Sequence, residues 1–285
     1  VELALTWDDT LGKDFKYNIS LNGSYNKNEV GNIPTSDGII HGAGDELYNN
    51  ASEFYRAENG QPIGYFWGYK TAGIFQNTQE IDEWRAAGNG ILQSNVQPGD
   101  VRFVDRNHDG QINDKDKVNL GNGTPDFTLG LNLGFVYKGF DFSIVANGAF
   151  GQQIVQSYRN HTRPTPNYTT AILDRWHGEG TSNRIPRVTD SNINYQFSDL
   201  FIQNGDYLRL STLTLGYDFA KLFKGKAVSQ ARLYFQVQNL FIITGYDGMD
   251  PEIGFGSSNN SWVSGLDYGY YPRPRTVLVG VNLKF

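Results

Sequence analysis

Oxygen-bearing side chains recur between residues 105 and 116 in a pattern that could bind a metal ion. Positions 1, 3, 5, 6, 7, 9 and 12 of a calcium loop are matched by Asp105, Asn107, Asp109, Gly110, Gln111, Asn113 and Asp116. Ca²⁺ favours several oxygen ligands, and the glycine permits the sharp turn. We therefore predict a structural Ca²⁺ held by side-chain oxygens of Asp105, Asn107, Asp109 and Asp116 and by the Gln111 carbonyl. The alternative is an Asx-rich turn satisfied by its own backbone hydrogen bonds.

No group of residues in the chain predicts catalysis. The four histidines are scattered, and cysteine is absent, which excludes a thiol nucleophile and a cysteine-based zinc site. The chain contains no nucleotide-binding or serine-hydrolase motif. No pair of carboxylates can be assigned to glycoside hydrolysis from spacing alone. We expect a protein that is not an enzyme and that has no organic cofactor.

Composition narrows the class further. Only 19% of the 285 residues are charged, below the roughly 25% typical of soluble domains, yet the mean hydropathy is −0.48. The chain is rich in glycine (33 residues) and in aromatic residues (14%). A net charge of −6 provides no basic face for nucleic acid. No apolar run approaches the roughly 18 residues that a membrane-spanning helix needs.

The elements that must position these residues are strands, because apolar and polar residues alternate along most of the chain. Seven strands are predicted at residues 1–7, 15–26, 127–137, 140–150, 207–219, 231–241 and 275–285. Most are longer than the usual five or six residues and match the roughly 9–11 that a tilted strand needs to cross a bilayer. The sequence therefore predicts an all-β fold, a transmembrane antiparallel β-barrel. A large soluble β-sandwich is the alternative.

The alternation also predicts two faces for these strands. A lipid face is expected for Leu129, Leu131, Leu133, Leu213, Leu215, Phe235, Val279 and Val281. A lumenal face is expected for Asn18, Asn22, Asn132, Gln236 and Asn282. We also predict that the last strand pairs with 231–241 on one side and with an absent N-terminal strand on the other.

The connections between strands alternate in length. The long ones, 27–126, 151–206 and 242–274, are predicted to be extracellular loops, with tight turns and the C-terminus on the periplasmic side. Seven strands cannot close a barrel, since bacterial single-chain barrels have at least eight strands and even numbers. Val1 begins directly in an alternating segment. We therefore expect further polypeptide before it.

Five segments in series resemble a known family. They are QPIGYFWGY at 61–69 with GIFQ at 73–76; PGDVRF, DRNHDGQIN and GNGTPDF between 98 and 127; YLRLSTLTLGY at 207–217; QNLFIITGYDG at 238–248 with DPE at 250–252; and YPRPR at 271–275. Together they resemble the SusC/RagA family, the TonB-dependent outer-membrane transporters of Bacteroidetes. His108 departs from the pattern, which usually has glycine there.

The resemblance implies a 22-stranded barrel of which residues 1–285 form the last seven strands, without the plug and the N-terminal strands. It implies TonB-dependent import of a glycan or a peptide, with a SusD-like lipoprotein in a dimer of transporter–lipoprotein pairs. TonB, ExbB and ExbD would act through the absent N-terminal part. The rival interpretations are a surface carbohydrate-binding or adhesin module and a porin-like channel that needs no energy.

Aromatic residues in the long connections could stack on sugar rings. The candidates for substrate binding are Trp67, Tyr69, Trp176, Trp262 and Tyr270. Aromatic residues also concentrate in interface cores, and some would contact the lipoprotein. The alternatives are packing that orders the long connections, or an aromatic girdle at the membrane interface.

Overall fold

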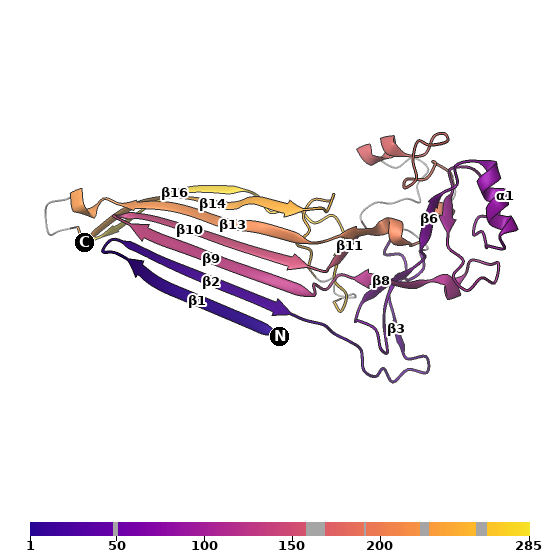
Figure 1. Ribbon diagram of the computed structural model, residues 1–285, viewed down its shortest axis with the longest axis horizontal. Helices are drawn as coiled ribbons and strands as arrows, with labels where there is room; N and C mark the ends of the chain where they lie inside the picture. The colour runs from indigo at the N-terminus through magenta and orange to yellow at the C-terminus, as the bar shows by residue number, and fades with distance from the viewer. Residues whose placement is uncertain (48–50, 158–168, 191, 223–227, 255–260) are drawn as a thin grey trace.

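A long antiparallel sheet of seven strands dominates the computed structural model, which describes residues 1–47, 51–157, 169–190, 192–222, 228–254 and 261–285 (Figure 1). Its spatial order is β1-β2-β9-β10-β13-β14-β16. The strands are β1 (Glu2–Leu11), β2 (Phe15–Tyr25), β9 (Phe127–Tyr137), β10 (Phe140–Phe150), β13 (Tyr207–Asp218), β14 (Gln230–Thr244) and β16 (Thr276–Lys284). All seven predicted strands are present, and the all-β fold is confirmed.

The register places the two predicted sets of side chains on opposite faces. Leu21 lies opposite Leu131, Leu215 opposite Phe235, and Phe235 opposite Val279. Directly paired residues point to the same side of a sheet, so the aliphatic residues share one face. The asparagines and glutamines that alternate with them occupy the other, as predicted.

Glycines on the polar face make room for the large polar side chains beside them. A Cβ atom on Gly130 would lie 2.2 Å from Oδ1 of Asn22. One on Gly216 would lie 2.7 Å from Nε of Arg232, whose guanidinium donates to Asp141 at 2.8 Å. Large polar side chains such as Asn22 and Arg232 therefore lie flat over the glycines of neighbouring strands instead of pointing perpendicular to the sheet.

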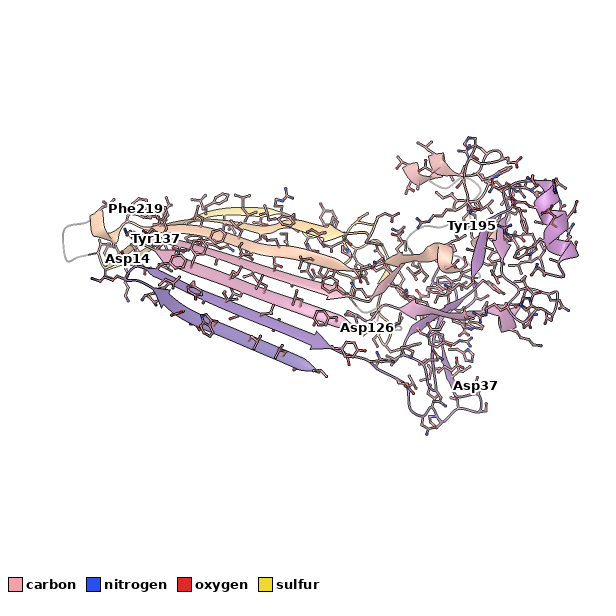
Figure 2. The ribbon with its side chains drawn as sticks, in the orientation of Figure 1. Asp14, Asp37, Asp126, Tyr137, Tyr195 and Phe219 are labelled. Atoms are coloured by element: carbon pink, nitrogen blue, oxygen red, sulfur yellow. The ribbon has the colours of Figure 1, made fainter. Side chains whose placement is uncertain are left out.

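The short connections lie at one end of the sheet, and the long ones at the other. Asp14, Tyr137 and Phe219 mark the short-connection end, whereas Asp126 lies where the sheet meets the long connections (Figure 2). The turn between β9 and β10 needs only Lys138 and Gly139, both with positive φ (48° and 94°). Such a pair forms the two-residue turn that matches the twist of a hairpin.

Two strand ends differ from the prediction by more than one residue. β1 continues to Leu11, so the first turn is shorter than the predicted 8–14. β14 continues to Thr244, because Ile242 and Ile243 pair with Arg209 and Leu208 across a bulge. Sequence alternation breaks at such a bulge, so the prediction from alternation ends the strand too early.

The three long connections fold together into one unit, which we call the cap and define as the described residues of 27–126, 151–206 and 245–274 (Figure 1). It contains three small sheets and the helix α1 (Thr78–Ala86). Its strands are β3 (Ile39–His41), β4 (Tyr55–Glu58), β5 (Tyr65–Gly68), β6 (Thr71–Ile74), β7 (Val101–Phe103), β8 (Val118–Asn122), β11 (Gln153–Gln156), β12 (Ile202–Asn204) and β15 (Leu266–Asp267). Its 3₁₀ turns are η1 (Asp114–Asp116), η2 (Thr170–Asp174), η3 (Asn192–Tyr195) and η4 (Asp199–Phe201), while η5 (Ala220–Leu222) follows β13.

The hydrophobic core lies in the cap and not in the long sheet. Phe54 and Phe66 come from the first connection, Val155 from the second, and Val263 and Leu266 from the third, and all five are buried in one cluster. The long connections are therefore held together by side-chain packing. Among the described helices, none is long and apolar enough to cross a membrane.

Candidate functional site

The 105–116 segment of the cap folds around two buried carboxylates. Oδ2 of Asp105 accepts hydrogen bonds from the backbone N–H groups of Gly90 (3.0 Å) and Gly110 (2.8 Å). Asp116, also buried, accepts from the backbone N–H of Arg106 (2.8 Å) and of Asn113 (2.8 Å). The two carboxylates thus close the loop at both ends.

The remaining members of the predicted calcium loop bond to one another. Oδ1 of Asn107 accepts from the backbone N–H of Asp109 at 3.0 Å, and Oδ1 of Asp109 accepts from that of Gln111 at 2.9 Å. This is the Asx-turn arrangement that was the alternative to a metal site. Across the described part of the chain, no three acidic or histidine side chains form a metal-binding group.

One atom of this loop still fits a cation. Oδ1 of Asp105 is buried and has no hydrogen-bond partner among the described residues, and a carboxylate oxygen is the ligand type that Ca²⁺ prefers. The ammonium of Lys117 pairs instead with Asp114 at 2.8 Å. The calcium site stays a prediction.

Two of the candidate aromatic residues lie side by side around β5 but are largely covered. The guanidinium carbon of Arg56 lies 3.4 Å from the ring centroid of Trp67, and the ammonium of Lys117 lies 4.3 Å from it. Tyr69 is buried against Phe103, with ring centroids 5.5 Å apart. Burial raises the pKa of Tyr69 to about 12.

The other three candidates lie elsewhere in the cap. Trp176 donates its indole N–H to Oε1 of Gln76 at 3.2 Å, and the ring of Trp262 lies 5.3 Å from that of Tyr55. Tyr270 is 44% exposed. Four of the five, Trp67, Tyr69, Trp176 and Trp262, make packing contacts within the cap. Substrate contact by all five stays a prediction.

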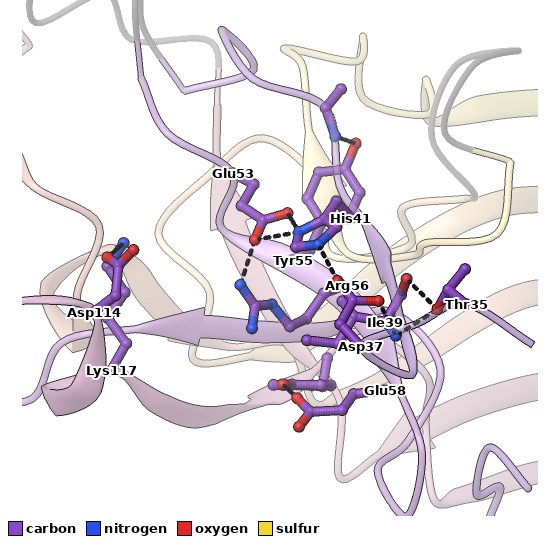
Figure 3. A network of polar contacts seen from close by, with 12 residues as sticks. Thr35, Asp37, Ile39, His41, Glu53, Tyr55, Arg56, Glu58, Asp114 and Lys117 are labelled. Atoms are coloured by element: carbon purple, nitrogen blue, oxygen red, sulfur yellow. Dashed lines mark hydrogen bonds and ion pairs between the residues drawn. The ribbon is translucent and has the colours of Figure 1, made fainter. Parts of the chain in front are cut away.

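A cluster of charged side chains that the sequence did not single out surrounds Glu53 (Figure 3). Glu53 accepts from Nδ1 of His41 at 2.9 Å and forms an ion pair with Arg56. The other ring nitrogen of His41 lies 3.1 Å from Oδ2 of Asp37. These carboxylates, Glu53 first, raise the pKa of His41, and its ring lowers the pKa of Asp37 to about 2.

A second charged cluster joins the sheet to the cap and unites three of the five sequence segments. Arg209 of β13 is only 4% exposed, and its Nη2 donates to Oδ1 of Asp250 at 2.6 Å. Oε2 of Glu252 lies 3.0 Å from Nε of Arg209 and 3.0 Å from Nη1 of Arg273. The sequence signal that points to this cluster is compositional. Only 19% of the residues are charged, so charged residues that recur within the five segments are unusual in this chain.

Comparison with known proteins agrees with this architecture, although no family model matches the chain. TonB-dependent receptor P3 of Formosa agariphila is 31% identical over 296 residues, which cover 100% of this chain and 28% of that receptor. TonB-dependent receptor SusC of Bacteroides thetaiotaomicron is 28% identical, covering 100% of this chain and 26% of the receptor. The chain therefore spans less than a third of the length of these relatives.

The fold has a counterpart of known structure. The RagAB peptide transporter superposes with a TM-score of 0.71 at 20% identity, over 100% of this chain and 29% of that one. The whole chain thus matches a part of such proteins in both sequence and fold. The resemblance seen in the five segments is confirmed: the chain corresponds to part of a TonB-dependent receptor of the SusC/RagA family.

Proposed function

We propose that the chain forms part of the barrel wall and the extracellular mouth of a TonB-dependent importer in the bacterial outer membrane. The two-faced sheet carries this proposal. On one face Leu215, Phe235 and Val279 are 48%, 43% and 71% exposed, with no covering layer in the described chain. An apolar surface of that extent needs lipid or another apolar partner, while a polar face suits a hydrated lumen.

The cargo we propose is a nutrient oligomer, an oligosaccharide in the first place and a peptide in the second. Import by this route consists of binding and gated passage, so that no bond of the cargo is broken. The cap would lie outside the cell, and the short turns and Phe285 would lie in the periplasm. The buried core that the three long connections share supports the proposal that the cap is one ordered unit at the entrance of the barrel, and not three separate loops.

The partners follow from the edges of the sheet and from the relatives. In the described chain, β1 and β16 each pair on one side only, and open edges are not tolerated in lipid. We propose that strands from the rest of the same transporter close the barrel to about 22 strands around a plug. A SusD-like lipoprotein would cover the cap, two such pairs would form a dimer, and TonB with ExbB and ExbD would open the plug.

We also propose that the 105–116 loop binds a structural Ca²⁺. The unpartnered Oδ1 of Asp105 supports it, with Asn107, Asp109, Gln111 and Asp116 as the further ligands. The experiment compares the complete transporter with its Asp105→Asn variant by isothermal titration with Ca²⁺. We expect binding that the variant weakens at least tenfold. Equal heats from both proteins, or none from either, would refute the site.

Transport is tested in cells that carry the complete transporter on a plasmid in a strain deleted for its gene. Uptake of labelled oligosaccharides and of labelled peptides is measured with TonB present and absent. We expect uptake of one class, lost without TonB. Uptake that continues without TonB indicates a porin-like channel, and a protein whose gel migration in detergent does not shift on heating is no barrel.

The C-terminal strand offers a control on membrane assembly. β16 pairs with β14, as predicted, and its Val279 and Val281 are exposed, as is Phe285, which follows the strand. We propose that the machinery that inserts the barrel into the membrane recognises this strand by pairing with its open edge, that is, by strand addition. Deleting Phe285 should lower the surface level of the transporter, whereas Phe285→Tyr should not. Normal surface levels of the deletion at native expression would contradict this role.

A further inference from the structure

A cavity opens on the polar face of the long sheet, where the sheet meets the cap. Its volume is about 350 Å³, at the lower end of the roughly 300–1,000 Å³ of small-molecule sites. The ends of β9, β10 and β13 form one wall, and residues around 123–125, 252–254 and 264 form the other. The cavity therefore faces the proposed lumen at its outer end.

Most polar groups of the wall are hydroxyls and amides: Thr124, Thr128, Ser264, Tyr207, Asn147 and Gln152. Several are held by partners within the protein. Oγ1 of Thr124 lies 3.2 Å from Oγ of Ser264, and Oγ1 of Thr128 lies 2.7 Å from Oγ of Ser24. A hydroxyl has one donor and two acceptor positions, so each of these groups keeps capacity for a ligand.

Charge in the wall is compensated. Glu252 is the single acidic or basic residue that lines the cavity among the described residues, and its Oε2 lies 3.0 Å from both Arg209 and Arg273. A charged ligand would find no unpaired counter-ion there. The wall also contains Pro125, Ala149 and Ile253, whose apolar surfaces suit the C–H face of a sugar ring.

Backbone pairing in the sheet argues against a bound peptide strand. Ala149 pairs with Thr128 on one side and with Tyr207 on the other. The backbone groups of the central strand are therefore used within the sheet, and a peptide cannot extend it by strand addition. The second wall is closely packed within itself, because a Cβ on Gly123 would lie 2.1 Å from the carbonyl oxygen of Ser264.

We propose that this cavity binds one unit of a neutral oligosaccharide and so selects saccharide over peptide cargo. The inference rests on the proposed function, since it assigns the cargo class of the same transporter. Hydroxyls of the sugar would exchange hydrogen bonds with Thr124, Ser264 and Asn147. The sugar ring would lie against Ala149 and Ile253. The ion-paired Glu252 would stay bonded to its arginines.

The experiment titrates the complete detergent-solubilised transporter with short glucan, fructan, xylan and mannan oligosaccharides, and with a tryptic peptide mixture. One variant combines Thr124→Val with Ser264→Ala, which removes two hydroxyls. A second, Ala149→Trp, fills the cavity. Thr212→Val is the matched control, because Thr212 lies on the same polar face outside the cavity. Heat-modifiable gel migration checks that each variant is folded.

We expect one oligosaccharide series to bind, with an affinity that falls about tenfold or more in the double variant. Ala149→Trp should abolish binding, and Thr212→Val should leave it within twofold. Saccharide binding that the cavity variants do not change overturns the cavity but leaves TonB-dependent import intact. Binding of peptides alone overturns the saccharide assignment only. Binding of neither class overturns this inference, and TonB-dependent uptake in cells then decides separately on the proposed function.

Discussion

Replacing Arg209 with methionine tests whether the charged cluster stabilises the junction between sheet and cap. The side chain is 4% exposed and contacts Asp250 at 2.6 Å and Glu252 at 3.0 Å. Removing one partner of a buried ion pair costs about 3–5 kcal/mol, because the other charge stays buried and unpaired. We expect about 3 kcal/mol, since Glu252 keeps its contact with Arg273.

Hydrogen exchange of the complete transporter, followed by mass spectrometry, measures this loss locally. A change of about 3 kcal/mol raises the opening constant of the junction more than hundredfold. Peptides covering 207–213 and 246–254 should therefore exchange faster, while peptides from β1 and β2 should not change.

Arg273→Met is the matched control. The Arg273 side chain is 51% exposed and contacts the same Glu252, and an exposed ion pair contributes only about 0–1 kcal/mol. Its effect on exchange should stay below about fivefold. Equal effects of the two variants, or a change of less than threefold in Arg209→Met, would refute the argument from burial.

Two further predictions concern the cap. Gly99→Ala should destabilise the cap by more than about 1 kcal/mol, because φ is +93° and the new methyl would lie 2.4 Å from Cε3 of Trp176. Thermal unfolding measures this loss. Gly88→Ala is the control, because Gly88 also has a positive φ but no close neighbour, and the difference between the two variants separates the clash from the backbone strain. The pairing of His41 with Glu53 and Asp37 should hold the β3–β4 hairpin most strongly between about pH 4 and 6.5. Its contribution is complete below the ordinary histidine pKa of 6.5 and is lost as pH rises through the raised pKa. It is also lost as pH falls from 3.8 toward the lowered pKa of Asp37, about 2. Exchange of residues 39–58, corrected for the intrinsic pH effect, should show this window in the wild type and not in His41→Gln.

The face that each strand residue occupies could be predicted from the sequence. Side chains alternate strictly along a strand, so Leu131 and Asn132 must point to opposite sides whatever their neighbours are. Strand length and composition then indicated a membrane as the solvent of the apolar face. The bulge in β14 could not be predicted from the sequence, because it interrupts the two-residue period at Asn239, whose φ is 51°.

The cap and its charged clusters were decided by tertiary structure alone. Phe54, Val155 and Val263 are separated by about a hundred residues each, yet they share one buried core. No local period encodes such a contact, because it depends on how three connections leave the same end of one sheet. The same holds for Arg209, Asp250 and Arg273. Each stands in a recognisable segment, but only the paired strands β13, β14 and β16 bring the three charges together. The alternation of single residues thus determined the wall, and packing between distant segments determined the mouth.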